Sequence, residues 1–182
     1  FMKGTIFYTV MPPEYEKKME HMVGEKLLAE ALEDLYGICL EHEGRSKGEH
    51  GKPFLSSRPE IHYNISHSGK YVVCVVAPQE VGADIQIHNE NINMKRILER
   101  TVPADLARQI LDAPDSCQAF YTQWVLREAY VKWTGEGLSR DLRRIDLDEG
   151  WYELLFVEPS YSMAVYAASP MELEWRKKNI SL

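Results

Sequence analysis

The sequence contains little cysteine, no long hydrophobic run and no excess of positive charge. Its three cysteines lie far apart without a C-x-x-C pair, so neither a disulfide framework nor a zinc site is expected, and reduced thiols favour a cytoplasmic location. The longest purely apolar run, residues 71–77, is far shorter than the ~20 residues of a membrane-spanning helix. A net charge of -7 disfavours a general binder of nucleic acid or of anionic membranes. We therefore expect no nucleic-acid partner and no membrane span.

The 182 residues, 45% hydrophobic and 27% charged, are typical of one or two small globular domains. Residues 5–10 predict a strand, and helical spacing of apolar residues predicts a helix over 14–36 that ends at Gly37. The glycines and prolines of residues 41–60 predict a loop. Residues 61–65 and 71–77 predict a hairpin around a turn at 66–69, and 81–87 alternates like a half-buried strand.

The second half of the chain predicts three helices followed by strands. The helices are expected over 94–100, 103–111 and 116–133, the strands over 142–147, 151–157 and 162–168, and a mobile polar tail after them. A weak echo between 71–78 and 161–170 suggests that each run closes one half of the chain. We thus predict an α+β fold in which the echo would divide the chain into two similar halves, 1–79 and 80–182, with the ligand cleft between them; a chance match of two short strands is the alternative that stays open.

A possible metal site combines a strand with a helix. Asp84 and Gln86 are two apart on a strand and share a face, and Glu128 could complete an oxygen cage from the helix. Few carboxylates with several waters suit Mg²⁺, which normally also takes substrate phosphate oxygens. Asp-x-Gln is a common pattern, however, and a solvated strand face with a helical surface salt bridge is the alternative that spacing alone leaves open.

Glu128 and Lys132 lie one helical turn apart, at i and i+4. A carboxylate that holds a metal beside an ammonium that reaches a phosphate would suit phosphoryl-group chemistry. The same spacing is also the commonest helix-stabilising ion pair, worth ~0.3 to 0.5 kcal/mol. Spacing by itself favours the ion pair.

Two further segments could bind phosphate. The run from Asn64 to Gly69 crowds hydroxyl and imidazole groups, and it is equally explained as a hairpin turn with capping hydroxyls. Adjacent Ser66 and His67 do not make a hydrolase triad, because neighbours rarely face one another and no G-x-S-x-G elbow is present. Gly51-Lys52-Pro53 lacks the flanking residues of a Walker loop.

Four motifs, taken together and in this order, carry a resemblance to a known family. They are Gly51-Lys52-Pro53, Asn64-Ile-Ser-His-Ser-Gly69, Val81-Gly-Ala-Asp-Ile-Gln86, and the helix from Trp124 through Arg127-Glu128 and Lys132 to Leu138. This arrangement resembles the 4′-phosphopantetheinyl transferases of the surfactin-activating (Sfp) type, over roughly residues 44–168.

The resemblance implies a pseudo-dimer with coenzyme A between its halves, and transfer of phosphopantetheine from coenzyme A to a serine of an apo acyl or peptidyl carrier protein. It implies that Asp84, Gln86 and Glu128 face Mg²⁺, that Glu128 or a metal-bound water takes the serine proton, and that Lys132 steadies the pyrophosphate. The coenzyme-binding residues that it implies are Lys52, Pro53, Ser66, His67, Arg127 and Lys132. The nucleophile belongs to the partner, so none is needed within the chain.

Three departures from the family pattern accompany the resemblance. Gln86 stands where the family usually has Glu, which removes one negative charge from the metal site. Arg127 replaces a lysine and changes the geometry of its charge. The N-terminal segment is short, and Lys17, Lys18 and His21 beside Glu20 are all that it offers to a coenzyme phosphate.

Two other functions stay open on sequence grounds. A weakly active or inactive homologue could serve as a coenzyme A or carrier-protein binding module, with Gln86 as its signature. A hydrolase using Ser66 and His67 would consume coenzyme A without any carrier protein.

Overall fold

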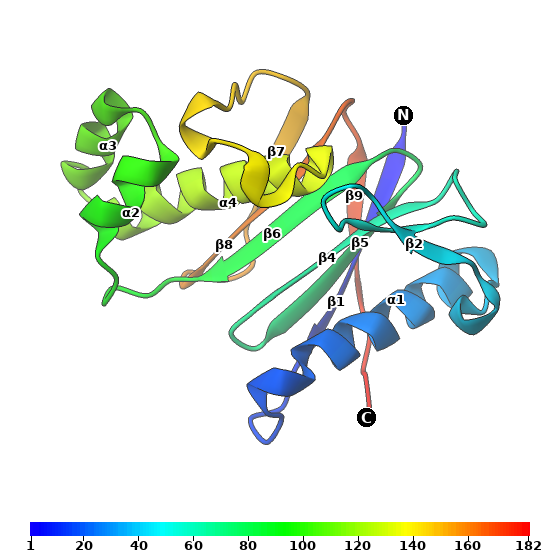
Figure 1. Cartoon of the computed structure of the whole chain (residues 1–182). Helices are drawn as coiled ribbons and strands as arrows, with labels where there is room; N and C mark the ends of the chain where they lie inside the picture. Colours follow the sequence, from blue (N-terminus) through cyan, green and yellow to red (C-terminus); the bar gives the residue numbers. More distant parts are fainter.

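A computed structural model describes all 182 residues, and Figure 1 shows two β-sheets, each covered by one long helix. The first sheet has the strand order β4-β5-β1-β9 and is covered by α1, Glu20–Tyr36. The second has the order β6-β8-β7 and is covered by α4, Ser116–Thr134. Apolar side chains of β1 and β5 pack on those of β6 and β8, so the layers run helix, sheet, sheet, helix. The predicted α+β class is confirmed.

The first sheet is mostly antiparallel and begins with β1, Lys3–Val10. β4, His62–Ser68, and β5, Tyr71–Ala77, form the predicted hairpin on one side of it. The turn is narrower than predicted: β4 continues through Ser68, and Gly69, with φ 57°, makes the reversal. The prediction of a turn over residues 66–69 was therefore wrong, because Ser66 and Ser68 belong to β4 and accept hydrogen bonds from amide groups of β6.

Helix α1 begins six residues later than its apolar spacing predicts. The amide of Tyr15 donates to the carbonyl of Pro12, which closes a turn, and a short 3-10 helix, Lys17–Met19, precedes α1. At the other end the prediction is confirmed: Gly37 adopts φ 64° and its amide caps the last turn. The predicted loop at 41–60 holds, in addition, a 3-10 turn, Leu40–His42, and two short paired strands, β2, Arg45–Lys47, and β3, Pro53–Leu55.

The second half follows the predicted order of elements with two corrections. β6, Val81–Ile87, leads to α2, Met94–Thr101, α3, Ala104–Leu111, and α4, and the chain returns through β7, Trp151–Leu155, and β8, Tyr161–Ala167. β6 is buried on both faces as far as Ile85, since a second sheet covers one face and α4 the other. The strand predicted at 142–147 is wrong: after a 3-10 turn at Gly137–Ser139, residues Leu142–Arg144 form another, and Leu142 and Ile145 pack on α4.

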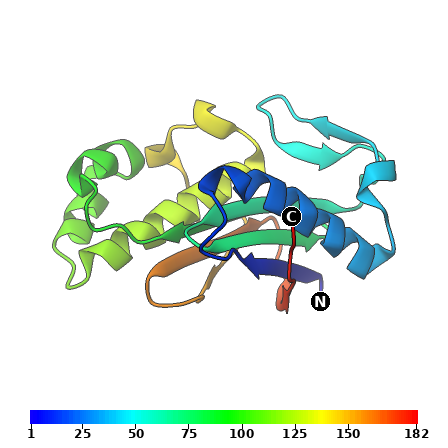
Figure 2. The ribbon, with the colours of Figure 1, turned by 90° about the horizontal axis from the view of Figure 1, so that it is seen from below.

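The predicted mobile tail is also wrong. Glu172–Lys177 forms β9, which pairs in parallel with β1 and adds an edge strand to the first sheet. Its residues are mostly exposed, as is typical of an edge strand, so their polar composition resembles that of a solvated tail. Figure 2 shows the C-terminal segment running beside the N-terminal strand.

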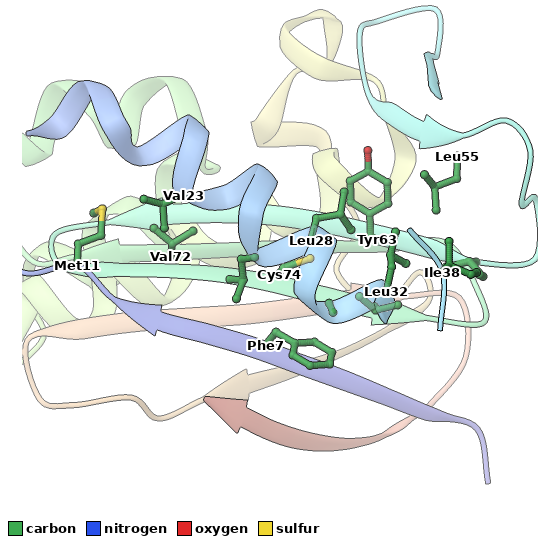
Figure 3. Close-up of a cluster of buried hydrophobic side chains, with 14 residues drawn as sticks. Phe7, Met11, Val23, Leu28, Leu32, Ile38, Leu55, Tyr63, Val72 and Cys74 are labelled. Atoms are coloured by element: carbon green, nitrogen blue, oxygen red, sulfur yellow. The ribbon is translucent and has the colours of Figure 1, made fainter. Parts of the chain in front are cut away.

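The core beneath α1 explains why that helix is fixed in place. Figure 3 shows Val23, Leu28 and Leu32 of α1 packed against Val72 and Cys74 of β5. All five are fully buried, and burying such a side chain contributes about 1.5 to 3 kcal/mol. β5 and β8, the two runs of the sequence echo, are buried along their whole length. Their first residues, Tyr71 and Tyr161, meet edge to face with ring centroids 4.9 Å apart.

No helix of the structure combines the length and the apolar character needed to cross a bilayer. Cys39, Cys74 and Cys117 are all free thiols, as predicted.

Candidate active site

A cavity of about 350 Å³ lies where the two halves of the chain meet. Its walls come from α1, from β4, from the loop before β3 and from the C-terminal end of α4 and the residues just after it. The residues that line the cavity include His21, Lys52, Pro53, Ile65, His67 and Lys132.

Side chains of β4 join the first sheet to β6. The amide groups of Ala83, Ile85 and Ile87 donate to Asn64 Oδ1, Ser66 Oγ and Ser68 Oγ, at 2.9, 3.1 and 2.9 Å. Residues two apart on a strand share a face, so these three side chains replace the partner strand that β6 lacks on this edge. These three hydrogen bonds hold Asp84 at a fixed distance from β4.

Gly82 brings α4 unusually close to β6. A Cβ atom at this position would lie 2.1 Å from the carbonyl oxygen of Ala129 and 2.3 Å from the amide nitrogen of Trp133. Only a glycine permits this approach, which places the neighbouring helix positions, Glu128 and Lys132, over the strand that carries Asp84.

Asp84 is almost fully buried, with 4% of its surface exposed. Gln86 Nε2 donates to Asp84 Oδ2 at 3.1 Å, Ser66 Oγ donates to Oδ1 at 3.4 Å, and Lys132 Nζ lies 3.9 Å from Oδ1. Burial raises the pKa of Asp84 to about 7, an effect that the Lys132 ammonium opposes and the nearby Glu128 carboxylate adds to. Asp84 and Gln86 thus share the predicted face, which is buried rather than solvated.

Glu128 and Lys132 project from α4 beside Asp84. Burial raises the pKa of Glu128, and burial lowers the pKa of Lys132. The alternative of a surface ion pair between the two is not formed: Lys132 Nζ instead donates to the carbonyl oxygen of Ile65 at 3.1 Å and faces Asp84. Two carboxyl groups and one ammonium group therefore lie close together, and Lys132 is the member of this group that lines the cavity.

The oxygen atoms around Asp84 fit a hard divalent cation. Burial raises the pKa of both Asp84 and Glu128, and a cation bound between them would favour their charged forms. No three His, Cys, Asp or Glu side chains gather to hold a metal, and beside Asp84 the chain has Gln86, whose amide oxygen is neutral. Such a set leaves room for water and phosphate oxygens, which Mg²⁺ requires.

Lys52 is held by the protein itself. Its ammonium donates to Glu80 Oε2 at 2.7 Å and to the carbonyl oxygens of Val81 and Trp133 at 2.9 and 3.3 Å. All three N–H donors have partners, so Lys52 ties the loop before β3 to β6 and to the end of α4. Lys52 and its neighbour Pro53 both line the cavity.

Ser66 and His67 point to opposite faces of β4. Ser66 is buried and its hydroxyl serves β6, whereas His67 lines the cavity with Nδ1 2.7 Å from Glu20 Oε2. The hydrolase alternative does not fit this geometry, because adjacent residues of a strand point to opposite faces and cannot form a nucleophile and base pair.

Arg127 does not reach the cavity. It is 4% exposed, one guanidinium nitrogen donates to Gln123, and Nε has no partner. Burial lowers its pKa. Among the N-terminal candidates, Lys17 and Lys18 are exposed, Lys18 pairs with Glu16 at 2.8 Å, and His21 alone lines the cavity.

Three features were not predicted from the sequence: the bond from Asn64 to β6, the close approach at Gly82 and the Glu20–His67 contact. The alternation of Asn64, Ser66 and Ser68 was a usable signal, since three polar residues on one face of a strand need partners. Gly82 in a strand interior was another, because such glycines often mark a close backbone approach. Nothing local in the sequence connects Glu20 with His67.

Comparison with known proteins identifies the family. Residues 80–167 match the model of the 4′-phosphopantetheinyl transferase superfamily. A 4′-phosphopantetheinyl transferase of Bacillus subtilis is 32% identical, and the 4′-phosphopantetheinyl transferase Sfp of Bacillus subtilis strain 168 is 30% identical; each match covers 86% of this chain and 78% of the relative. A human L-aminoadipate-semialdehyde dehydrogenase-phosphopantetheinyl transferase is 26% identical over 70% of this chain and 46% of its own. The matched region contains Gly82, Asp84, Gln86, Glu128 and Lys132, and on these grounds the chain belongs to the 4′-phosphopantetheinyl transferases and is an enzyme of the Sfp type.

Proposed function

We propose that this transferase moves 4′-phosphopantetheine from coenzyme A to a serine of an apo acyl or peptidyl carrier protein, with Mg²⁺ as cofactor. The observation that carries the proposal is the cluster of Asp84, Glu128 and Lys132, whose lysine lines a cavity between the two halves. The family membership supplies the class of reaction, and these three side chains supply groups suited to it.

In the proposed reaction the serine hydroxyl of the carrier attacks the phosphorus that bears the pantetheine. A new phosphorus–oxygen bond forms to serine, the pyrophosphate bond breaks, and adenosine 3′,5′-bisphosphate leaves. Glu128 accepts the serine proton, a role that its raised pKa favours because a more basic carboxylate is a better general base. Lys132 steadies the pyrophosphate and donates to the leaving oxygen.

The metal would be held by Asp84, Gln86 and Glu128. When bound, Mg²⁺ supplies positive charge that stabilises the phosphate oxygens during transfer. Ser66 and Gln86 hold the Asp84 carboxylate by hydrogen bonds and so fix its orientation toward this position.

The coenzyme would occupy the cavity. His67 and Pro53 contact it directly, and Lys52 and Ser66 contribute mainly by holding the walls, since their polar groups are engaged within the protein. Arg127 would act on the coenzyme only through its charge, because it lies outside the lining.

We further propose that residues 1–79 and 80–182 are similar halves of a pseudo-dimer in a cytoplasmic enzyme. Each contains a sheet covered by one long helix, and the equivalent tyrosines Tyr71 and Tyr161 meet between them. β9 is an exception, since it leaves the second half and joins the first sheet.

A non-catalytic binding module is the second candidate, and Gln86 is the observation that favours it. Intact-mass spectrometry separates the two functions. Apo carrier protein, coenzyme A and Mg²⁺ should give a carrier heavier by one phosphopantetheine, and a carrier whose serine is replaced by alanine should gain nothing. Binding of coenzyme A without any mass gain over several carriers would favour the binding module, and loss of coenzyme A without carrier would indicate hydrolysis.

A further inference from the structure

The contact between α1 and β4 brings a buried carboxylate against the ring of a cavity-lining histidine. Glu20 is 7% exposed, and its Oε2 lies 2.7 Å from Nδ1 of His67. No other side chain bonds to the Glu20 carboxylate. A carboxylate in this setting is retained only if a partner compensates its desolvation, and His67 is that partner.

The register of helix and strand fixes this contact. Glu20 and Gly24 are four apart on α1, a step of about 6 Å, and His67 and Ile65 are two apart on β4, a step of about 6.7 Å. A Cβ on Gly24 would lie 3.0 Å from Cγ2 of Ile65, so the helix rests closely on the strand at that point. Because the two steps are similar, close packing of Gly24 on Ile65 places Glu20 over His67.

We infer that Glu20 is a positioning residue that orients the His67 ring for a phosphate of coenzyme A. Glu20 occupies Nδ1 and holds a proton there, which leaves Nε2 as the free ring nitrogen of a side chain that lines the cavity. A phosphate at Nε2 would place the ring between two anions, where both ring nitrogens donate. This inference rests on the proposed function, since it takes coenzyme A as the ligand.

The electrostatics of the cavity are consistent with this arrangement. Lys132 on α4 also lines it, and His21 on α1 and His50 in the loop before β3 complete the basic side. Glu25, the acidic residue of the lining, is paired with Arg45 and is therefore already neutralised. Glu20 lies behind His67, so the ring separates its charge from the cavity.

A double-mutant cycle tests the inference through coenzyme A binding measured by calorimetry. Glu20→Gln keeps the shape of the side chain and removes its charge, and we expect coenzyme A affinity to fall about tenfold with kcat at saturation little changed. In a His67→Ala background, which itself weakens binding, Glu20→Gln should have almost no further effect, because its action passes through the ring. Glu33→Gln, an exposed acid on the same helix, is the matched control.

Nitrogen NMR of His67 reports the tautomeric state of its ring. A purely structural role of Glu20 in α1 would leave that state unchanged. In the free parent protein Nδ1 should carry the proton, and Glu20→Gln should shift the ring toward a mixture of tautomers. Equal losses of affinity from Glu20→Gln in both backgrounds, or unchanged His67 resonances, would overturn the inference. Failure of the parent to bind coenzyme A would instead overturn the proposed function, and the tautomer measurement on the free protein would still decide the role of Glu20.

Discussion

The buried Asp84 carboxylate lies beside the neutral amide of Gln86. A second carboxylate in place of this amide would repel Asp84 unless a cation lay between the two. Gln86 donates to both oxygens of Asp84, at 3.4 and 3.1 Å, and in this way stabilises the buried charge in the absence of metal. The same side chain offers only a neutral oxygen to a cation. The residue therefore favours folding without metal at the expense of metal affinity.

Replacing this amide should reverse the balance. For Gln86→Glu we expect Mg²⁺ to bind about 5- to 30-fold more tightly in the presence of coenzyme A, which corresponds to ~1 to 2 kcal/mol after desolvation. The melting temperature without Mg²⁺ should fall, because two carboxylates then lie side by side, and it should recover when Mg²⁺ is added. Calorimetric titration and thermal unfolding measure the two effects, and an unchanged Mg²⁺ affinity would mean that Gln86 faces away from the ion.

Lys52 is expected to matter for stability as much as for the ligand. Lys52→Met keeps much of the stem but leaves the carbonyl groups of Val81 and Trp133 without their donor, which should lower the free energy of unfolding by ~1 to 3 kcal/mol. Lys47→Met, an exposed lysine in the same loop region, should cost much less. Urea unfolding compares the two variants; equal stability, combined with a large loss of coenzyme affinity for Lys52→Met, would make Lys52 a direct phosphate ligand instead.

The long helices and the central strands were predictable because each carries its own periodicity. β5, β6 and α4 agree with the prediction to within a residue, since alternation or helical spacing is strong there. The start of α1, the 3-10 turn at 142–144 and β9 were not predictable from local patterns. For α1 the cause is a local turn between Pro12 and Tyr15 that the helical spacing does not reveal, and for the other two it is a tertiary contact, packing on α4 or pairing with β1.

The site shows the same division between local and long-range information. Asp84, Gln86 and Glu128 could be named from strand and helix spacing together with a family resemblance. The partners of Ser66, Lys52 and Glu20 could not, because they join segments 18 to 81 residues apart that meet only in the folded chain. The family resemblance predicts which residues belong to the site, whereas the fold determines which of their side chains are free to bind a ligand.

Gly82 of β6 allows the backbone of α4 to approach and so determines where that helix lies. Gly82→Ala would place a methyl group against the backbone of α4, where neither partner can move without breaking the helix, so we expect a loss of at least ~3 kcal/mol in unfolding free energy. Any folded fraction should transfer more slowly, since Glu128 and Lys132 move with α4. Gly48→Ala, which meets only a carbonyl oxygen at 3.7 Å, is the control. Equal stability of the two variants in urea would show that α4 does not need this close approach.

Considered as a whole, the molecule is acidic, and its cationic residues near the end of α4 are largely neutralised. The net charge is -7, Arg140 lies 3.7 Å from Glu136, and Arg143 and Arg144 lie 3.1 and 3.7 Å from Asp141. Carrier proteins are typically acidic as well, so broad charge attraction between the two is weak. Apolar contacts should therefore dominate docking of the carrier.

Salt should accordingly have little effect on docking. Between about 0.05 and about 0.5 M NaCl we expect the KM for carrier protein to change less than about threefold. Arg143→Gln should leave this dependence unchanged. A steep rise of KM with salt, abolished by Arg143→Gln, would identify a dominant basic docking patch.

If the cluster of Asp84, Glu128 and Lys132 performs phosphopantetheine transfer, Glu128→Gln should abolish it. The variant preserves the shape of α4 but removes both a metal ligand charge and the proposed proton acceptor. Transfer to apo carrier would be followed by intact mass at saturating coenzyme A and Mg²⁺, with coenzyme A affinity and the melting temperature measured on the same samples. We predict a loss of nearly all transfer with the melting temperature preserved, whereas a rate within about tenfold of the parent would contradict the account.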